Sequence, residues 1–231
     1  MFHILDISDR DEEVVKEDTD HKEIAYESGD DGSDEEVKKT YNAKGTESFV
    51  VHLFGSTADG TPVRVDCKGF NPYFYLRIPD GVLTGVYLEA VNSYIKKCLK
   101  DVANKVKLTL VKRKVMYGYT GNTLFNFIEL KVPSLKLFRN CRSLFLNNKN
   151  EPKTRFPING GTPRVYEANL DPYLRFLHLR NLKPCDWCIV KEGMAIADKT
   201  EAGYVIEDCD WEDIGPYSAS KTAPFKLASW S

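Results

Sequence analysis

The feature that most constrains the fold of this sequence is a change of hydrophobic period between residues 72 and 168. In four runs apolar residues recur at every second position, which is typical of strands, and in two runs they recur at helical spacing. The runs follow one another as strand (72–78), helix (84–104), strand (106–119), strand (123–132), helix (134–145) and strand (164–168). This is the split βαβ order of ferredoxin-like and RRM-type folds.

Further strand-like runs lie on both sides of this segment. Residues 2–7, 48–54 and 61–70 precede it, and residues 185–191 and 203–209 follow it, after a helical run at 171–182. Five strands suffice for a small barrel. The sequence therefore predicts an α+β protein with a discontinuous OB-like β-barrel (1–70 and 183–214) interrupted by a ferredoxin/RRM-like βαββαβ unit that includes the connecting helix (71–182).

Charge is distributed unevenly along the chain. Residues 9–36 carry a net charge of −11, the remainder carries +9, and the total is −2. Residues 9–45 are too polar to form a core, so we expect them to be a mobile acidic insertion in the barrel part. The basic remainder suits a polyanion-binding surface, although ordinary solubilising charge is the alternative interpretation.

Several classes of protein are disfavoured. No apolar run is long enough for a membrane span and the N-terminus does not resemble a signal peptide, so we expect an intracellular protein that is not secreted and has no membrane partner. The six cysteines suit reduced thiols. Cys185 and Cys188 form a CxxC without a matching second pair, and Asp208 to Asp213 suit a solvated turn. We expect no catalytic residues and no metal site in this segment.

Aromatic and basic residues point to single-stranded nucleic acid. Two stretches rich in lysine and arginine, 96–114 and 131–155, flank the aromatic strands. Phe125 and Phe127 share one face of their strand, as do Tyr73 and Tyr75, and RRM domains stack bases on such aromatics. The alternative is that these rings pack against the two helices.

Three stretches resemble B-family replicative DNA polymerases, in particular the delta-like catalytic subunit. They are FVVHLFGSTADGTPVRVDCKGFNPYFYLRIP, VKRKVMYGYTGN and VYEANLDPYLRFLHLRNLKPCDW, in the same order as in the family. The large acidic insertion and the delta-like pattern together resemble the enzymes of large eukaryotic DNA viruses more than cellular ones.

The resemblance implies the N-terminal domain of a DNA-directed DNA polymerase, with an OB-like and an RRM-like part. Such a domain binds single-stranded template and scaffolds the 3′-5′ exonuclease and polymerase domains. Both catalytic carboxylate sets, and the Mg²⁺ expected for the complete polymerase, would lie outside this sequence. Residues 215–231 would lead into the exonuclease domain, so we expect a part of a longer polymerase or of one encoded in pieces.

The implied partners are DNA, as single-stranded template and primer-template duplex, the other domains of the same enzyme, and a processivity factor bound through other regions. The implied location is the nucleus or a cytoplasmic viral replication site. A free-standing single-stranded nucleic-acid-binding protein and a purely structural docking module are the alternatives. The candidate nucleic-acid-binding residues are Lys112, Arg113, Lys114, Tyr117, Tyr119, Phe125, Phe127, Arg155 and Arg164.

Overall fold

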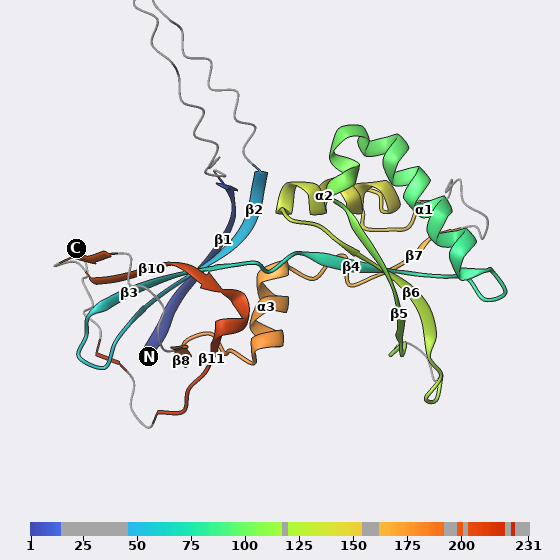
Figure 1. Cartoon of the computed structure of the whole chain (residues 1–231). Helices are drawn as coiled ribbons and strands as arrows, with labels where there is room; N and C mark the ends of the chain where they lie inside the picture. Colours follow the sequence, from blue (N-terminus) through green and yellow to red (C-terminus); the bar gives the residue numbers. More distant parts are fainter. Residues whose placement is uncertain are drawn as a thin grey trace, which may run out of the picture.

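The computed structural model describes residues 1–14, 46–116, 120–153, 162–191, 198–200, 203–219 and 223–224. They form a mixed α+β structure with a curled sheet and a second, smaller sheet (Figure 1). Helix α3 (Pro172–Arg180) lies between the two sheets. The α+β class expected from the sequence is confirmed.

The curled sheet takes strands from both ends of the chain. Its order is β11-β8-β1-β2-β3-β10-β9, and β3 and β10 are parallel neighbours. Strands before and after the 72–168 segment therefore share one sheet. The strands are β1 (Phe2–Val14), β2 (Thr46–Ser56), β3 (Pro62–Lys68), β8 (Trp187–Val190), β9 (Asp198–Thr200), β10 (Gly203–Asp210) and β11 (Ile214–Pro216), with a 3₁₀ turn at Trp211–Asp213 before β11.

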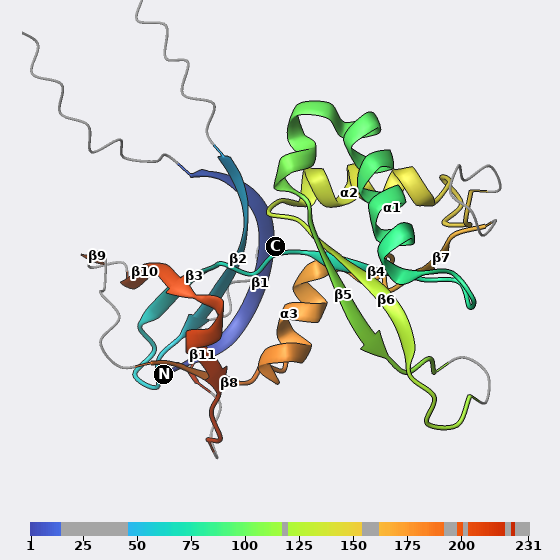
Figure 2. The same ribbon diagram turned by 45° about the vertical axis from the view of Figure 1, so that its right-hand side comes forward.

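The second sheet has the strand order β5-β6-β4-β7, and each of its neighbouring strands is antiparallel. Helices α1 and α2 cover one of its faces (Figures 1 and 2). The elements are β4 (Tyr73–Arg77), α1 (Thr84–Leu99), a 3₁₀ helix η1 (Lys100–Lys105), β5 (Lys107–Arg113), β6 (Phe125–Lys131), α2 (Leu135–Phe145) and β7 (Arg164–Tyr166).

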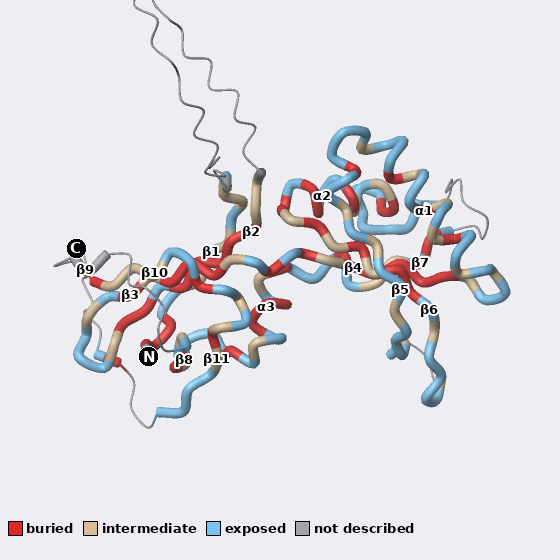
Figure 3. Tube along the Cα trace, in the orientation of Figure 1, coloured by how far each residue is buried: buried red, intermediate tan, exposed pale blue. Residues whose placement is uncertain are grey.

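Each sheet has its own hydrophobic core. Phe49, Leu53 and Val65 are fully buried in the core that the curled sheet shares with α3. Phe74 and Ile128 belong to the core between the second sheet and its two helices. Figure 3 shows buried segments through the middle of both sheets and exposed segments at their ends. Burial of apolar area drives folding, so the sheet faces that form these cores stay covered. Only the opposite faces are available for binding.

The two helices on the second sheet follow from their side-chain spacing. Tyr87, Val91 and Ile95 recur at four-residue intervals and are the buried residues of α1. Helix α2 begins after Ser134, whose hydroxyl oxygen accepts a hydrogen bond from the Leu137 N–H at 3.3 Å. Such a cap satisfies one of the free N–H groups of the first turn. Both helices lie where the sequence predicted them.

Strand β1 is longer than the sequence indicated. The expected mobile insertion starts at Asp9, but β1 continues to Val14 and pairs with β2, from Asp9 opposite Val51 to Val14 opposite Thr46. That expectation was wrong for residues 9–14. Backbone pairing with β2 stabilises this polar segment despite its low strand propensity. Residues 15–45 lie outside the described residues.

We call the curled sheet with its core the first unit, and the second sheet with α1 and α2 the second unit. Asp11, in this extension of β1, contacts the second unit. Its two carboxylate oxygens accept hydrogen bonds from the backbone N–H groups of Leu135 at 2.6 Å and Lys136 at 2.9 Å. These are the first two residues of α2, where N–H groups have no partner within the helix. A carboxylate from β1 therefore caps α2 and holds the two units together.

The alternation of β1 is interrupted near its start. The sequence predicts a regular two-residue period over 2–7, but the pairing with β2 shifts between Ile4 and Asp6. Opposite this bulge the backbones approach closely, because a Cβ atom at Gly55 would lie 2.2 Å from the His3 carbonyl oxygen. Only glycine fits at this point of β2.

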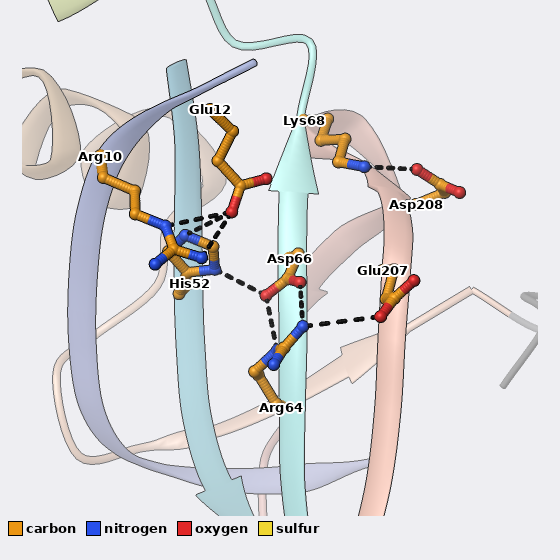
Figure 4. A network of polar contacts seen from close by, with 8 residues as sticks. All are labelled: Arg10, Glu12, His52, Arg64, Asp66, Lys68, Glu207 and Asp208. Carbon is orange, nitrogen blue, oxygen red and sulfur yellow. Dashed lines mark hydrogen bonds and ion pairs between the residues drawn. The ribbon is translucent and has the colours of Figure 1, made fainter. Parts of the chain in front are cut away.

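A polar network crosses β1, β2, β3 and β10 (Figure 4). The Nδ1 atom of His52 lies 2.6 Å from an oxygen of Asp66, and its Nε2 lies 3.5 Å from Glu12. Arg64 donates two hydrogen bonds to Asp66, at 3.1 and 2.8 Å, and its guanidinium lies 3.7 Å from Glu207. Basic and acidic groups are paired here, so the network links strands rather than presenting free charge to a ligand.

Candidate nucleic-acid interface

The second sheet has one face without helices α1 and α2, which we call the open sheet face. Alternation along the strands, with the observed register, assigns side chains from all four strands to it. The residues on the opposite face, such as Phe74 and Ile128, pack in the helix core. The open sheet face consists of Lys107, Thr109, Val111 and Arg113 from β5, Phe125, Phe127, Glu129 and Lys131 from β6, Tyr73, Tyr75 and Arg77 from β4, and Arg164 and Tyr166 from β7.

A row of aromatic rings crosses this face. Tyr73 and Tyr75 are 5.5 Å apart between ring centroids, Tyr75 and Phe127 are 6.2 Å apart, and Phe127 and Tyr166 are 5.3 Å apart. The rings meet edge to face, an arrangement that stabilises aromatic pairs. Tyr75 is 8% exposed and Phe127 is 3% exposed. The two central rings, of Tyr75 and Phe127, are therefore covered.

Burial also affects the chemistry of Tyr75. Desolvation of the phenol, followed by the neighbouring Tyr73, raises the pKa of Tyr75 to about 12. The hydroxyl group is therefore neutral at physiological pH. The central strands of the open sheet face thus carry neutral aromatic groups beside Arg77 and the ion pair between Lys131 and Glu129, whose charged atoms lie 3.4 Å apart.

Two arginines stack on aromatic rings of this face. The guanidinium carbon of Arg77 lies 3.9 Å from the centroid of Phe125, and that of Arg175, from α3, lies 4.0 Å from the centroid of Tyr73. Arg77 also pairs with Asp80 at 3.0 Å. Guanidinium groups are planar and stack on aromatic faces as bases do. The rings of Phe125 and Tyr73 therefore have the orientation that a flat ligand group requires.

The predicted basic residues are divided between two faces of the sheet. Arg113 lies on the open sheet face opposite Phe125, and Arg164 lies there opposite Arg77. Lys112 pairs with Asn126 and so lies on the other face. Both Arg113 and Arg164 are exposed.

The remaining predicted residues lie beyond the strands. Lys114 follows β5, and its Nζ donates a hydrogen bond to Asn122 at 2.9 Å. Tyr117, Tyr119 and Arg155 fall outside the described residues. The structure thus brings together Arg113, Phe125, Phe127 and Arg164, and it places Lys112 on the opposite face.

The sequence reasoning missed two residues of the open sheet face, Arg77 and Tyr166, and one residue of α3 that stacks on this face, Arg175. Arg77 lies two residues after Tyr75, so the two-residue period already placed it on the same face. Tyr166 pairs with Tyr75 and Arg175 comes from another element, and both follow only from the tertiary arrangement.

A polar cavity of about 300 Å³ lies at the junction of the two units. Its lining includes Asp9, Arg139 and Asp171, from β1, α2 and the start of α3. Desolvation, followed by the charge of Asp171, raises the pKa of the Asp9 carboxyl, while Arg139 acts in the opposite direction. Folding therefore places a carboxylate where its charged form is disfavoured.

Among the described residues, no group of three or more His, Cys, Asp and Glu side chains could hold a metal ion. Cys185 is exposed and Cys188 is buried, so the CxxC thiols do not converge. In the same part of the chain, every helix is too short or too polar to cross a lipid bilayer.

Known proteins resemble this chain in sequence. A family model described as DNA polymerase family B, exonuclease domain, matches residues 163–231. The DNA polymerase of Paramecium bursaria Chlorella virus NY2A is 27% identical over 188 residues, which cover 81% of this chain and 18% of the viral protein. The DNA polymerase of Acanthamoeba polyphaga mimivirus is 27% identical over 80% of this chain and 11% of its own length.

The chain is a homologue of viral DNA polymerases, and its residues 163–231 match family B. The eukaryotic delta catalytic subunit of Dictyostelium discoideum is 28% identical over 150 residues, or 59% of this chain and 13% of that subunit. The resemblance stated from the sequence, with enzymes of large DNA viruses among the relatives, is confirmed.

Family B polymerases also share the fold. The structure of the enzyme from the archaeon Pyrobaculum calidifontis superposes with a TM-score of 0.50 at 19% identity, covering 77% of this chain and 19% of the archaeal chain. The present chain spans less than a fifth of the length of these polymerases.

Proposed function

We propose that this chain is the N-terminal region of a family B DNA-directed DNA polymerase, that it binds single-stranded template on the open sheet face, and that it is not catalytic by itself. The observation that carries the proposal is the juxtaposition of exposed Arg113 and Arg164 with Phe125 on that face. Arginine binds phosphate oxygens, and an aromatic ring stacks on any base. The combination suits single strands without sequence preference.

The finer fold assignment is part of the proposal. We assign residues 1–70 and 183–214 to an OB-like part, 71–182 to an RRM-like part with its connecting helix, and 215–231 to a lead-in to the exonuclease domain. The order β5-β6-β4-β7, with both helices on one face, supports the RRM-like assignment. The curled sheet with parallel β3 and β10 supports a barrel that the inserted unit interrupts.

The individual roles follow from position. Arg113 and Arg164 contact phosphates at opposite edges of the face, and Lys114 extends the contact beyond β5. Phe125 accepts a base when the Arg77 guanidinium moves off its ring, whereas Phe127 supports the sheet from its buried position. Lys112 lies on the other face of the sheet, so it contacts the nucleic-acid strand only beyond the edge of β5. We retain Tyr117, Tyr119 and Arg155 as candidates outside the described residues.

The scaffolding role rests on the relatives. The exonuclease-domain model overlaps β7, α3 and the last strands of the curled sheet. We propose that these elements face the exonuclease domain of the same enzyme. We also propose that this enzyme acts at an intracellular replication site. Divalent metal chemistry belongs to the other domains.

The test measures binding of a fluorescent oligo-dT of about 20 nucleotides to the purified chain across a salt series. We expect weak binding whose affinity falls with salt, and a salt slope about 0.7 smaller for each phosphate contact removed in Arg113→Gln or Arg164→Gln. Lys183→Gln, an exposed lysine outside the second sheet, is the matched control. Nucleotide incorporation by the chain alone would overturn the non-catalytic role, and absence of binding at low salt would indicate a docking module.

The same assay distinguishes the proposed polymerase region from the alternative, a free-standing single-stranded nucleic-acid-binding protein. Stacking contributes about 1 to 3 kcal/mol per base, so a dedicated single-strand binder should bind tightly and lose roughly tenfold or more in Phe125→Ala. The polymerase region should bind weakly and lose less, because the Arg77 guanidinium competes for that ring.

A further inference from the structure

A second basic surface lies next to the open sheet face. It runs from the C-terminal half of α1 through η1 to β5, and Asp101 is the one acidic residue in this stretch. All of its lysines are exposed. We call it the lysine ridge, and it consists of Lys96, Lys97, Lys100, Lys105, Lys107 and Lys112.

The charge of the lysine ridge is not compensated within the described part of the chain. None of its six ammonium groups takes part in the ion pairs found there within 4.0 Å. In contrast, Lys68 pairs with Asp208 at 2.6 Å and Lys136 pairs with Glu47 at 3.0 Å. Six like charges that form no ion pair repel one another, and a polyanion that binds across them relieves that repulsion.

The lysine ridge is continuous with the open sheet face at one strand. β5 is an edge strand of the second sheet and directly follows η1 (Figure 2). Lys107 pairs with Lys131 on the open sheet face, whereas Lys112 pairs with Asn126 on the opposite face. A single strand of nucleic acid that leaves the open sheet face over β5 therefore meets lysines on both sides of that edge.

The chemistry of the lysine ridge favours phosphate over bases. Lysine is a flexible point charge without the planar fork that reads base edges. Tyr94 is the one aromatic residue of this stretch, and it packs against the helix core and the Phe145 ring, so the lysines have no exposed stacking platform among them. An extended row of such charges matches the regular negative charge of a nucleic-acid backbone.

We infer that the lysine ridge is a second, sequence-independent binding surface for the phosphate backbone of the same single strand, reached over the edge of β5. The inference rests on the proposed function, because the open sheet face supplies the first part of the path. It predicts that a short oligonucleotide occupies the open sheet face alone, and that a long one occupies both surfaces.

The first experiment compares oligo-dT of about 6 nucleotides, which is within the site size of one domain, with oligo-dT of about 25 nucleotides, which exceeds it. In the triple variant K96Q/K97Q/K100Q we expect unchanged binding of the short oligonucleotide, roughly tenfold weaker binding of the long one, and a salt slope lower by about 2. The control variant K68Q/K183Q/K191Q removes the same charge from the other unit. Equal effects of the two variants on the long oligonucleotide would overturn the inference.

A second experiment uses the unmodified chain. Cys98 is exposed among the ridge lysines, and Cys185 is exposed on the other unit. The long oligonucleotide should slow alkylation of Cys98 by N-ethylmaleimide several-fold and leave Cys185 unchanged, and the short one should protect neither.

Alkylation of Cys98 at the same rate with the long oligonucleotide bound would contradict the inference while leaving the proposed function intact. If the unmodified chain binds neither oligonucleotide, the proposed function fails as well, and an acidic protein segment becomes the partner to test on the ridge.

Discussion

The guanidinium carbon of Arg175 lies 4.0 Å from the centroid of the Tyr73 ring, which connects α3 to β4. The next two residues of α3, Phe176 and Leu177, are buried in the core of the curled sheet. Arg175 also pairs with Glu167 at 2.8 Å. One helix therefore contributes to the core of one unit and stacks on the open sheet face of the other.

Replacing Arg175 should destabilise the junction. The Arg175 side chain is 4% exposed, and stacking in such a desolvated site contributes about 2 kcal/mol. We expect Arg175→Ala to lower the free energy of unfolding by about this amount and Arg175→Lys to lower it by a smaller amount, because lysine keeps the charge without the planar group. Urea denaturation measures both. Arg10→Ala, at a side chain 64% exposed, is the control, and equal unfolding midpoints for all variants would exclude this role.

Asp11 should be required for the stability of α2. Asp11→Ala removes both hydrogen bonds to the first turn of α2, and loss of a helix cap costs about 1 kcal/mol. Thermal unfolding followed by circular dichroism should show a lower Tm. Ser134→Ala removes the cap within the α2 segment itself, and the double variant should show non-additive loss because both caps act on the same turn. An unchanged Tm in Asp11→Ala would mean that water replaces the carboxylate.

Asp9 should make stability depend on pH. The pKa of the Asp9 carboxyl is raised in the folded state above its ordinary value of 3.8. The protonated carboxyl therefore stabilises the folded protein below pH 3.8, and this stabilisation is lost as the pH rises through the folded-state pKa. At pH 7 the folded protein therefore contains a disfavoured charge. We expect Asp9→Asn to raise the Tm at pH 7. The gain in the free energy of unfolding should be less than about 1 kcal/mol, because the Asp9 carboxyl is partly solvated. Near pH 3.5 the variant should lose this advantage.

Scanning calorimetry at the two pH values measures the effect of Asp9→Asn. Asp101→Asn, at an exposed aspartate, is the control. A lower Tm in Asp9→Asn at pH 7 would show that attraction to Arg139 dominates instead.

Two glycines should respond in opposite directions to a methyl group. In Gly55→Ala the new Cβ would overlap the His3 carbonyl oxygen, so β1 or β2 must move, and we expect a loss of more than about 2 kcal/mol. Gly85, in the first turn of α1, has no atom near its Cβ position. Gly85→Ala should stabilise the chain by about 0.5 kcal/mol through the unfolded state. Chemical denaturation of both variants tests the pair, and similar changes would refute the close approach at β1.

The sequence predicted the local elements well. The order from β4 to β7 follows from hydrophobic period alone, because each element buries one face on a shared core. The predicted helix at 84–104 is observed as α1 followed by η1, and the predicted helix at 171–182 is observed as α3. Both helices bury apolar residues in a core, such as Val91 and Ile95 in α1 and Phe176 and Leu177 in α3, so local and tertiary preferences agree.

Other features depend on contacts that no local pattern encodes. The extension of β1 beyond Asp9 is polar, and it is held by its pairing with β2, by the cap on α2 and by the contact of Glu12 with His52. The burial of Phe127 and the stacking of Arg175 on Tyr73 depend on how the two units pack. The period placed Phe125 and Phe127 on one face but could not show which ring the neighbours would cover.

The parallel pairing of β3 with β10 has a consequence for synthesis on the ribosome. The strands of the second sheet, β4 to β7, leave the exit tunnel one after another, so that unit is complete while β1 still lacks its partner β8 and β3 still lacks its partner β10. Until β10 emerges, one edge of β3 in the nascent chain has unpaired backbone groups. Because such an edge is prone to aggregation, translation of the segment from β4 to β10 is the interval in which this protein most needs a chaperone.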